Sequence, residues 1–212
     1  MKKWAGWVWF ILLVSAPAVS AADLTVADPN LQECIEKLAK KNKWQTAEEV
    51  EEIVCHASKI QSLAGITKFS QIKKLSVHKN QITAVDLSGL TLLEHLNIAR
   101  NELVELVLEG LPNLQEVYVF GNKLRTFRVT HLPKLTLLKG NSNVLTQFSY
   151  SDAPLLEKIY LFDNQLETID IYHLPGMKYM DVRQNPMPDE LYEEMDALEN
   201  VTILHEGNAE DW

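Results

Sequence analysis

Asparagine recurs at a fixed interval along most of this chain of 212 residues. Each member of the series stands 21 residues after the one before it, at Asn80, Asn101, Asn122, Asn143, Asn164 and Asn185. One template, L-x-x-L-x-L-x-x-N, precedes them as IKKLSVHKN, LEHLNIARN, LQEVYVFGN, LTLLKGNSN, LEKIYLFDN and MKYMDVRQN. A second apolar set follows each asparagine, and glycine and proline residues punctuate it. This periodicity is typical of a chain that winds in equal coils, each built from one repeat.

A single repeat of this kind cannot stand alone, because ordering its backbone costs more free energy than its few apolar side chains return. Stacked coils bury both of their sides and pair their strands about 4.8 Å apart in a parallel sheet. Asparagine suits the turn because its side chain carries both a donor and an acceptor. We therefore expect each asparagine to satisfy backbone groups of its own coil and of the next coil.

The repeats resemble leucine-rich repeats, and most closely those of the internalin-like group of exported bacterial proteins. The resemblance covers about residues 50 to 206. It implies an α/β solenoid, a curved arc with a parallel sheet on its concave face and a ladder of asparagines at the turn. It also implies that the chain binds a protein.

An open stack of strands exposes raw edges, so both ends should carry caps. We assign residues 22–49 to a helical N-terminal cap, 50–187 to the repeats, and 188–212 to a C-terminal cap and tail. The segment DPNLQECIEKLAKKNKW reads as a helix that begins at Asp28 and Pro29 and carries Leu31, Cys34, Ile35 and Leu38 on one face. Pro188 to Ala197 reads as a second, shorter helix with Leu191 and Met195 turned inward.

The first residues have the three-part layout of a secretory signal peptide, which we assign to residues 1–21. Lys2 and Lys3 precede an uncharged run, and the run ends in the small residues Val19-Ser20-Ala21. A retained membrane helix is the alternative. Cleavage would remove two lysines and move the formal charge from −9 to −11. We expect an exported chain, periplasmic or secreted, that neither inserts in a membrane after cleavage nor binds nucleic acid.

The chain has two cysteines, Cys34 and Cys55. In an oxidising compartment such a pair predicts a disulfide, which would join the first helix to the first strand. Two free thiols are the alternative. A metal site that also uses His56 is a weaker one, because structural zinc prefers four ligands. We predict no metal site and no cofactor.

The third, fifth and seventh template positions should point out of the sheet, since side chains alternate along a strand. Large side chains gather at these positions in the middle and later repeats. A contiguous patch of rings beside cations has the composition of a binding site. The predicted partner-binding residues are Tyr118, Phe120, Leu137, Lys139, Tyr160, Phe162, Tyr179 and Arg183. Alternatively, the rings pack only on one another as cross-strand pairs.

Gly140 breaks the template, because it takes a slot that holds Val, Ile or Leu in the other repeats. An empty slot would leave a cavity. One reading is that Phe148 and Tyr150 supply the missing volume from the return of the same coil. The other is a local bulge that opens the surface between Phe120 and Phe162.

None of the common catalytic signatures occurs in the chain, so we expect no enzyme activity and name no catalytic residue. We predict a monomeric module that binds an unknown protein through the ring patch. Two alternatives remain. The patch could hold a glycan or cell-wall polymer, or the chain could be a structural envelope protein.

Overall fold

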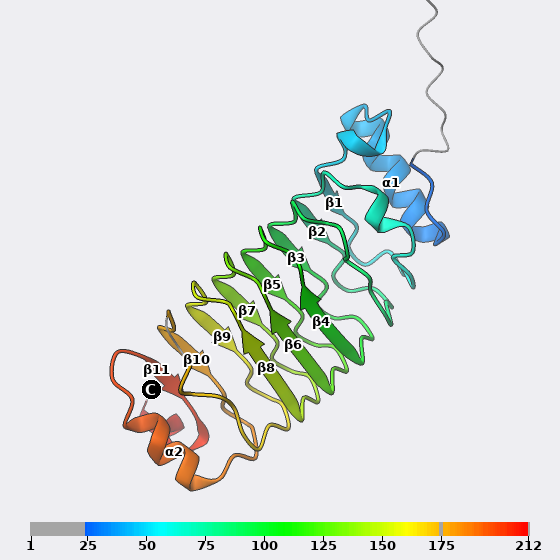
Figure 1. Ribbon diagram of the computed structural model, residues 1–212. Helices are drawn as coiled ribbons and strands as arrows, with labels where there is room; N and C mark the ends of the chain where they lie inside the picture. The colour runs from blue at the N-terminus through cyan, green and yellow to red at the C-terminus, as the bar shows by residue number, and fades with distance from the viewer. Residues whose placement is uncertain (1–23, 174–175, 212) are drawn as a thin grey trace, which may run out of the picture.

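The computed structural model describes residues 24–173 and 176–211. The predicted signal peptide lies outside the described residues. The described chain winds as a coil, with helix α1 at one end and helix α2 at the other (Figure 1). The expected solenoid with a parallel sheet and helical caps is therefore confirmed.

One strand of each coil joins an eight-stranded parallel sheet in the order β1-β2-β3-β5-β7-β9-β10-β11. The side of this sheet that points away from the coil interior is called the sheet face below. All eight strands are three residues long. They are β1 (Glu52–Val54), β2 (Lys74–Ser76), β3 (His95–Asn97), β5 (Glu116–Tyr118), β7 (Leu137–Lys139), β9 (Lys158–Tyr160), β10 (Tyr179–Asp181) and β11 (Thr202–Leu204).

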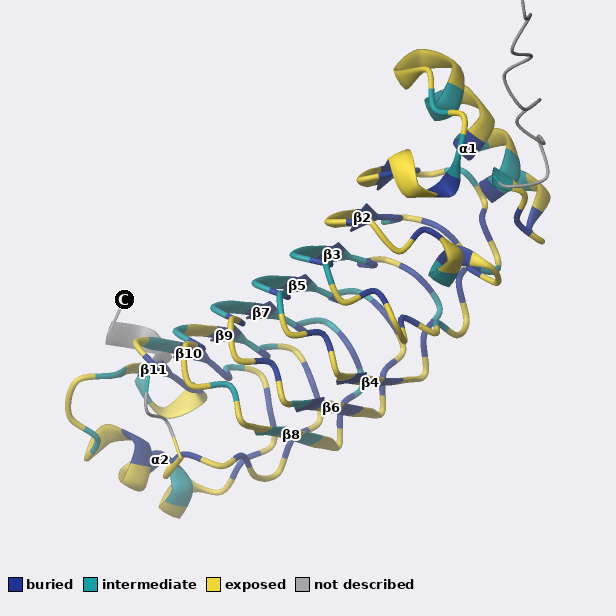
Figure 2. Ribbon diagram, turned by 45° about the horizontal axis from the view of Figure 1, so that its top comes forward, coloured by how far each residue is buried: buried dark blue, intermediate teal, exposed yellow. Residues whose placement is uncertain are grey.

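The coils stack in register, so that equivalent template positions lie side by side. Val117 of β5 faces Leu96 of β3 and Leu138 of β7, for example. The apolar template positions point into the coil, where the leucines are fully buried (Figure 2). The fixed repeat length makes this register possible, because after each full coil the chain reaches the position next to the equivalent residue of the preceding coil.

The six asparagines of the series are buried at the turn that ends each strand. The side-chain amide of Asn101 donates to the carbonyl oxygens of Val77 and Ile98 at 3.1 and 3.0 Å, and its oxygen accepts from the amide of Ile82 at 3.0 Å. Val77 and Ile82 belong to the preceding coil. The expectation that the asparagines bond to the next coil was therefore wrong in direction, because each side chain reaches back.

The residue before each asparagine has a left-handed backbone. Its φ lies between 54° and 66° in the sequence Lys79, Arg100, Gly121, Ser142, Asp163 and Gln184. Only one of these residues is glycine, although the conformation is unfavourable for other residue types. The stacked coils therefore hold this turn through their shared hydrogen bonds rather than through local sequence preference.

The return segments of three successive coils form a second parallel sheet, to which the repeat template assigned no structure. Its strands are β4 (Glu105–Glu109), β6 (Thr126–Thr130) and β8 (Gln147–Ser151). The signal was present in the strict alternation of Glu105, Leu106, Val107 and Leu108, in which the leucines are buried and Val107 is exposed. Coils in this region therefore have a sheet on both sides (Figure 1).

Helix α1 (Pro29–Asn42) closes the N-terminal end of the stack and buries Leu31 and Ile35. Asp28 caps this helix by accepting from the amides of Asn30 and Leu31 at 2.9 and 3.0 Å. Cys34 and Cys55 form the predicted disulfide, which joins α1 to the residue after β1. Short 3₁₀ helices at Ala47–Glu49 and Ile66–Lys68 complete this end of the chain.

Helix α2 (Asp189–Asp196) covers the other end, followed by β11 and a 3₁₀ segment at Glu206–Asp211. Met195 is buried as expected, but Leu191 is only half-buried and Tyr192 takes the inner position. Tyr192 stacks on the ring of His205 at 4.5 Å and donates to the carbonyl oxygen of Asn185 at 3.2 Å. Within the described residues, no helix is both long and apolar enough to cross a membrane.

Candidate partner-binding surface

Three rows of side chains run across the middle of the sheet face, one for each outward template position. Each row crosses four neighbouring coils. The third positions give Glu116, Leu137, Lys158 and Tyr179; the fifth give Tyr118, Lys139, Tyr160 and Asp181; the seventh give Phe120, Asn141, Phe162 and Arg183. All eight residues that the sequence singled out lie in these rows, and all are half-buried. Figure 2 shows intermediate burial along β5 and β7, two of the strands that carry these residues.

Tyr118, Lys139 and Tyr160 are three successive residues of the fifth-position row. The ammonium nitrogen of Lys139 lies 5.8 Å from the ring centroid of Tyr118 and 4.8 Å from that of Tyr160. A cation over a ring face within about 6 Å is attracted by the ring quadrupole. Tyr160 also contacts Tyr179, with centroids 5.2 Å apart and ring planes inclined by 43°. A continuous group of three tyrosines and one lysine therefore spans four coils.

Phe120 and Phe162 stand on either side of Asn141 in the seventh-position row. The guanidinium carbon of Arg100 lies 5.9 Å from the Phe120 ring centroid. Phe162 lines a hollow of about 290 Å³ together with Arg183, Gln184 and Glu206. Among the described residues, neither phenylalanine contacts another aromatic ring. Mutual ring packing therefore does not account for these two side chains.

Arg183 is paired with Asp181, the last residue of β10. Its Nε and Nη2 donate to the two carboxylate oxygens of Asp181 at 2.9 and 2.7 Å. The Asp181 side chain is 3% exposed, so the guanidinium supplies the counter-charge that burial requires. Hydrogen bonding to Asp181 raises the pKa of Arg183 further above its usual value. Because Asp181 balances its charge, Arg183 stands at the edge of the patch as one half of an ion pair and not as a free cation.

The N-terminal half of the sheet face is polar. His56 and His78 face one another with ring centroids 3.9 Å apart, and Nε2 of His56 lies 2.7 Å from the hydroxyl of Ser76. The pKa of His56 lies below its usual value, mainly because the ring is partly buried and further because of its electrostatic interactions with His78 and Lys74. The described residues hold no cluster of three or more His, Cys, Asp or Glu side chains that could bind a metal.

Glu116 links the polar half to the ring group. It accepts from the Tyr118 hydroxyl at 3.0 Å, and its carboxylate lies 3.4 Å from Nδ1 of His95. Burial raises the pKa of Tyr118, and the hydrogen bond to Glu116 raises it further. Tyr118 therefore stays protonated and held in one orientation, which suits a rigid contact residue.

Gly140 leaves neither a bulge nor an empty slot. Its amide donates to the Tyr160 carbonyl at 2.8 Å, and the strands on either side keep their register. A methyl group placed on Gly140 would lie 3.1 Å from Cδ2 of Leu161, 3.6 Å from Cδ2 of Leu138 and 3.7 Å from Phe127. The alternative of a bulge that opens the surface between Phe120 and Phe162 does not occur. The neighbouring side chains do fill the slot, but Phe127 lies nearest to it rather than Phe148 or Tyr150, and the ring of Phe148 packs on that of Phe127 with centroids 5.6 Å apart.

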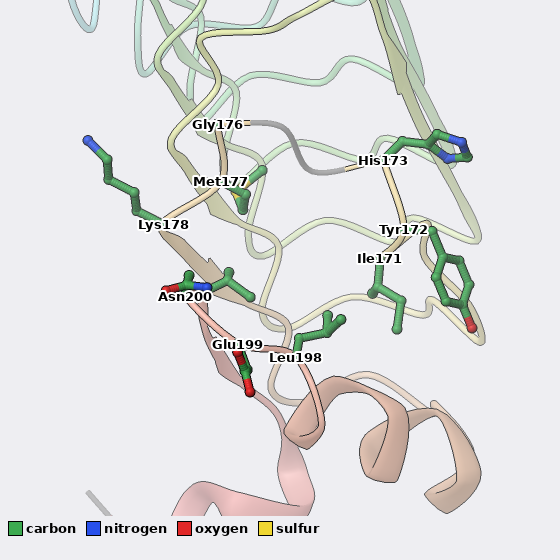
Figure 3. Close-up of a pocket in the computed structure, with 10 residues that line it drawn as sticks. Ile171, Tyr172, His173, Gly176, Met177, Lys178, Leu198, Glu199 and Asn200 are labelled. Atoms are coloured by element: carbon green, nitrogen blue, oxygen red, sulfur yellow. The ribbon is translucent and has the colours of Figure 1, made fainter.

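A hollow lies away from the sheet face, between the last returns of the coil (Figure 3). It measures about 820 Å³, and its lining includes Ile171, Met177, Leu198 and Val201. In Figure 3 the side chains of Tyr172 and His173 point away from the other lining residues. Its lining is mainly apolar, and no sequence motif predicted it.

Many solved structures match this coil, and two of them serve as examples. An internalin from Listeria monocytogenes matches over 84% of this chain and 63% of its own, with 21% sequence identity and a TM-score of 0.54. A leucine-rich-repeat protein from Leptospira interrogans matches over 65% of this chain and 38% of its own, with 24% identity and a TM-score of 0.56. The fold is that of leucine-rich-repeat proteins.

These similarities extend to the fold alone. The chain spans less than two thirds of either matched protein. No protein-family profile matches the sequence, and no curated protein is significantly similar to it. The predicted resemblance to internalins is thus borne out as a structural likeness of repeats of about 21 residues.

Proposed function

We propose that this chain is an exported recognition module that binds a protein through the ring patch on its sheet face. The patch consists of Tyr118, Phe120, Leu137, Lys139, Tyr160, Phe162, Tyr179 and Arg183. One observation carries the proposal: large apolar and aromatic side chains stand half-buried on one face of a rigid sheet, where smaller residues would serve the fold equally well.

The equivalent positions of earlier coils support this view. Ser76, Asn97 and Ala99 occupy the fifth and seventh positions of coils whose strands pair in the same way. Pairing of the strands therefore does not require aromatic rings at the fifth and seventh positions. Tyrosine and phenylalanine held by flanking strands lose little conformational entropy on binding, which is why such residues dominate binding energies at interfaces.

Export is the second part of the proposal. The Cys34–Cys55 disulfide fits an oxidising compartment, and the lysines followed by an apolar run at the start of the chain fit a cleaved leader. Mass spectrometry of the protein from its native host should find a mature chain that begins near residue 22. Recovery of the full-length chain from a membrane pellet would contradict cleavage.

Site-specific photo-crosslinking in the native compartment tests the binding role. A cross-linking residue in place of Asn141 stands between Phe120 and Phe162, and one in place of Ser149 on β8 lies on the opposite sheet and serves as the control. We expect position 141 alone to capture a defined polypeptide. The replacement of Tyr118 and Phe162 by Ser should abolish that capture. Equal capture at both positions would argue against recognition by the patch.

A glycan or cell-wall polymer is the second candidate, because tyrosine rings beside amide and ammonium groups also suit sugars. A glycan array probed with the wild type and with the Tyr118→Ser/Phe162→Ser variant separates the two. Binding of a sugar that the variant loses, with no captured polypeptide, would favour the polymer. A purely structural envelope protein would show neither result.

A further inference from the structure

We infer that the partner presents an acidic segment, whose carboxylates are bound by Lys139 and Lys158 in the centre of the ring patch. The inference rests on the proposed function and adds to it the chemistry of the bound segment. It follows from how lysines are paired along this coil and from two lysines of the sheet face that are not paired.

Four lysines of the coil, among them Lys74 on the sheet face, are neutralised by a glutamate of the coil before them. Lys73 pairs with Glu51, Lys74 with Glu52, and Lys178 with Glu157, with nitrogen to oxygen distances of 3.0, 2.6 and 2.6 Å. Lys123 pairs with Glu102 in the same way. Each glutamate stands 21 or 22 residues before its lysine, so strand stacking itself brings the charges together.

Lys139 and Lys158 lack this arrangement. The strand register places Lys139 between Tyr118 and Tyr160, and Lys158 between Leu137 and Tyr179. Neither ammonium group forms an ion pair with any described residue. The two lysines therefore keep their full charge for an incoming group.

The nearby carboxylates on the same face are already engaged. Glu116 accepts from the Tyr118 hydroxyl and lies beside His95, and the strand register places it opposite Leu137 rather than opposite Lys139. Asp181 is held in two hydrogen bonds by Arg183 and is almost fully buried. Neither can turn to a lysine without leaving its partner.

The rings make Lys139 a better anion site than an ordinary surface lysine. Contact with both tyrosine rings restricts the side chain, so less entropy is lost when a carboxylate binds. A docked partner would exclude water from the pair and strengthen it. The chain as a whole carries a formal charge of −9, so an acidic segment is repelled by the molecule at large and attracted at this place. Charge complementarity thus favours one docking register.

A library of short random peptides displayed on phage tests the inference with the full mature chain as bait. Peptides that bind the wild type and fail to bind a Phe120→Ser/Phe162→Ser variant are sequenced and synthesised. The rings that Lys139 contacts as a cation are those of Tyr118 and Tyr160, so this variant leaves both in place and the selection reports the ring patch independently of the lysines. Dissociation constants are then measured for lysine variants at low and high salt.

We expect the selected peptides to be enriched in Asp and Glu. Lys139→Gln/Lys158→Gln should weaken their binding about 5- to 20-fold, and it should reduce the dependence of affinity on salt. Lys139→Arg/Lys158→Arg should keep most of the affinity. The matched control is Lys40→Gln/Lys41→Gln in the last turn of α1, which removes the same charge elsewhere and should leave affinity unchanged.

Three outcomes would overturn the inference. Ring-dependent peptides without acidic enrichment, indifferent to both lysine variants, would leave the proposed function standing and remove the acidic segment. Lysine-dependent binding of polygalacturonate without binding of any acidic peptide would reassign the lysines to an anionic glycan. The absence of any ring-dependent binder would reject the proposed function and the inference together.

Discussion

Arg183 and Asp181 lie two residues apart on the sheet face and are joined by two parallel hydrogen bonds, at 2.9 and 2.7 Å. Asp181 belongs to β10, and its side chain is 3% exposed while that of Arg183 is 38% exposed. A carboxylate so well buried next to a half-exposed guanidinium depends on that guanidinium for its charge to be tolerated.

Arg183→Ala should therefore destabilise the fold by about 1–3 kcal/mol, because it leaves Asp181 buried and unpaired. The double variant Arg183→Ala/Asp181→Ala should lose less than the sum of its two single variants. Urea denaturation followed by circular dichroism measures all three. Additive losses would mean that the pair is not coupled.

Asn122 binds the middle coils together through its amide. It donates to Ile98 and Val119 carbonyl oxygens at 3.1 and 2.9 Å and accepts from the Leu103 amide at 3.1 Å. Asn122→Ala should cost about 1–3 kcal/mol because these groups are buried and lose their partner. Asn122→Asp should be as damaging, since a carboxylate keeps the acceptor but offers no donor to the two carbonyls. An Asp variant as stable as the wild type would show that the donors contribute nothing.

The contribution of Asp28 to the stability of the N-terminal cap should depend on pH. Burial favours the protonated carboxyl, but bonds from the amides of Leu31, Gln61, Ser62 and Asn30 outweigh burial and hold the pKa of Asp28 below its usual 3.8. Because the folded state lowers this pKa, its contribution to stability is present above about pH 4 and is lost as the pH falls through the folded value. Unfolding free energies measured from pH 7 down to pH 2 should show this loss.

The matched variant is Asp28→Asn, which keeps the shape and removes the charge. It should be less stable than the wild type at pH 7 by about 1–3 kcal/mol, because the amide nitrogen that replaces one carboxylate oxygen cannot accept from the backbone amides of Gln61 and Ser62. The difference should shrink at the acid end of the range. Parallel stability curves for the two proteins at all pH values would contradict the assignment.

Gly140 is predicted to be intolerant of larger side chains, even though every other repeat places Val, Ile or Leu at its position. A methyl group already meets Leu161 at 3.1 Å, which is closer than ordinary contact. Gly140→Val should therefore destabilise the chain by about 1–3 kcal/mol through overpacking. Gly140→Val combined with Phe127→Leu should recover part of the loss. A more stable Gly140→Val variant would reveal a void that the neighbouring side chains do not fill.

Most of the coil could be predicted from the spacing of residues. A 21-residue interval between asparagines and an apolar template in each repeat leave one economical arrangement, in which equivalent positions stack. The strands and the first helix follow from that template and from local capping signals around Asp28. The sheet of β4, β6 and β8 was missed, because its alternation of buried and exposed residues is short and lies outside the template.

The candidate surface was placed by the same arithmetic, since outward positions follow from strand alternation. The interactions of its charged side chains could not be predicted in this way. Arg183 looked like a free cation, and only the structure binds it to Asp181. Lys139 looked like one of several lysines, and only the structure sets it between two rings without a carboxylate.

The sequence by itself determined the winding of this protein, the pairing of coils and the face on which its rings stand, because all three depend on the repeat length and on which positions are apolar. The tertiary structure decided which charges are neutralised and which remain free, how the slot at Gly140 is filled, and in which direction the asparagines bond. Those outcomes depend on distances between side chains of different coils, and a periodic pattern fixes the order of such neighbours without fixing the atoms that meet.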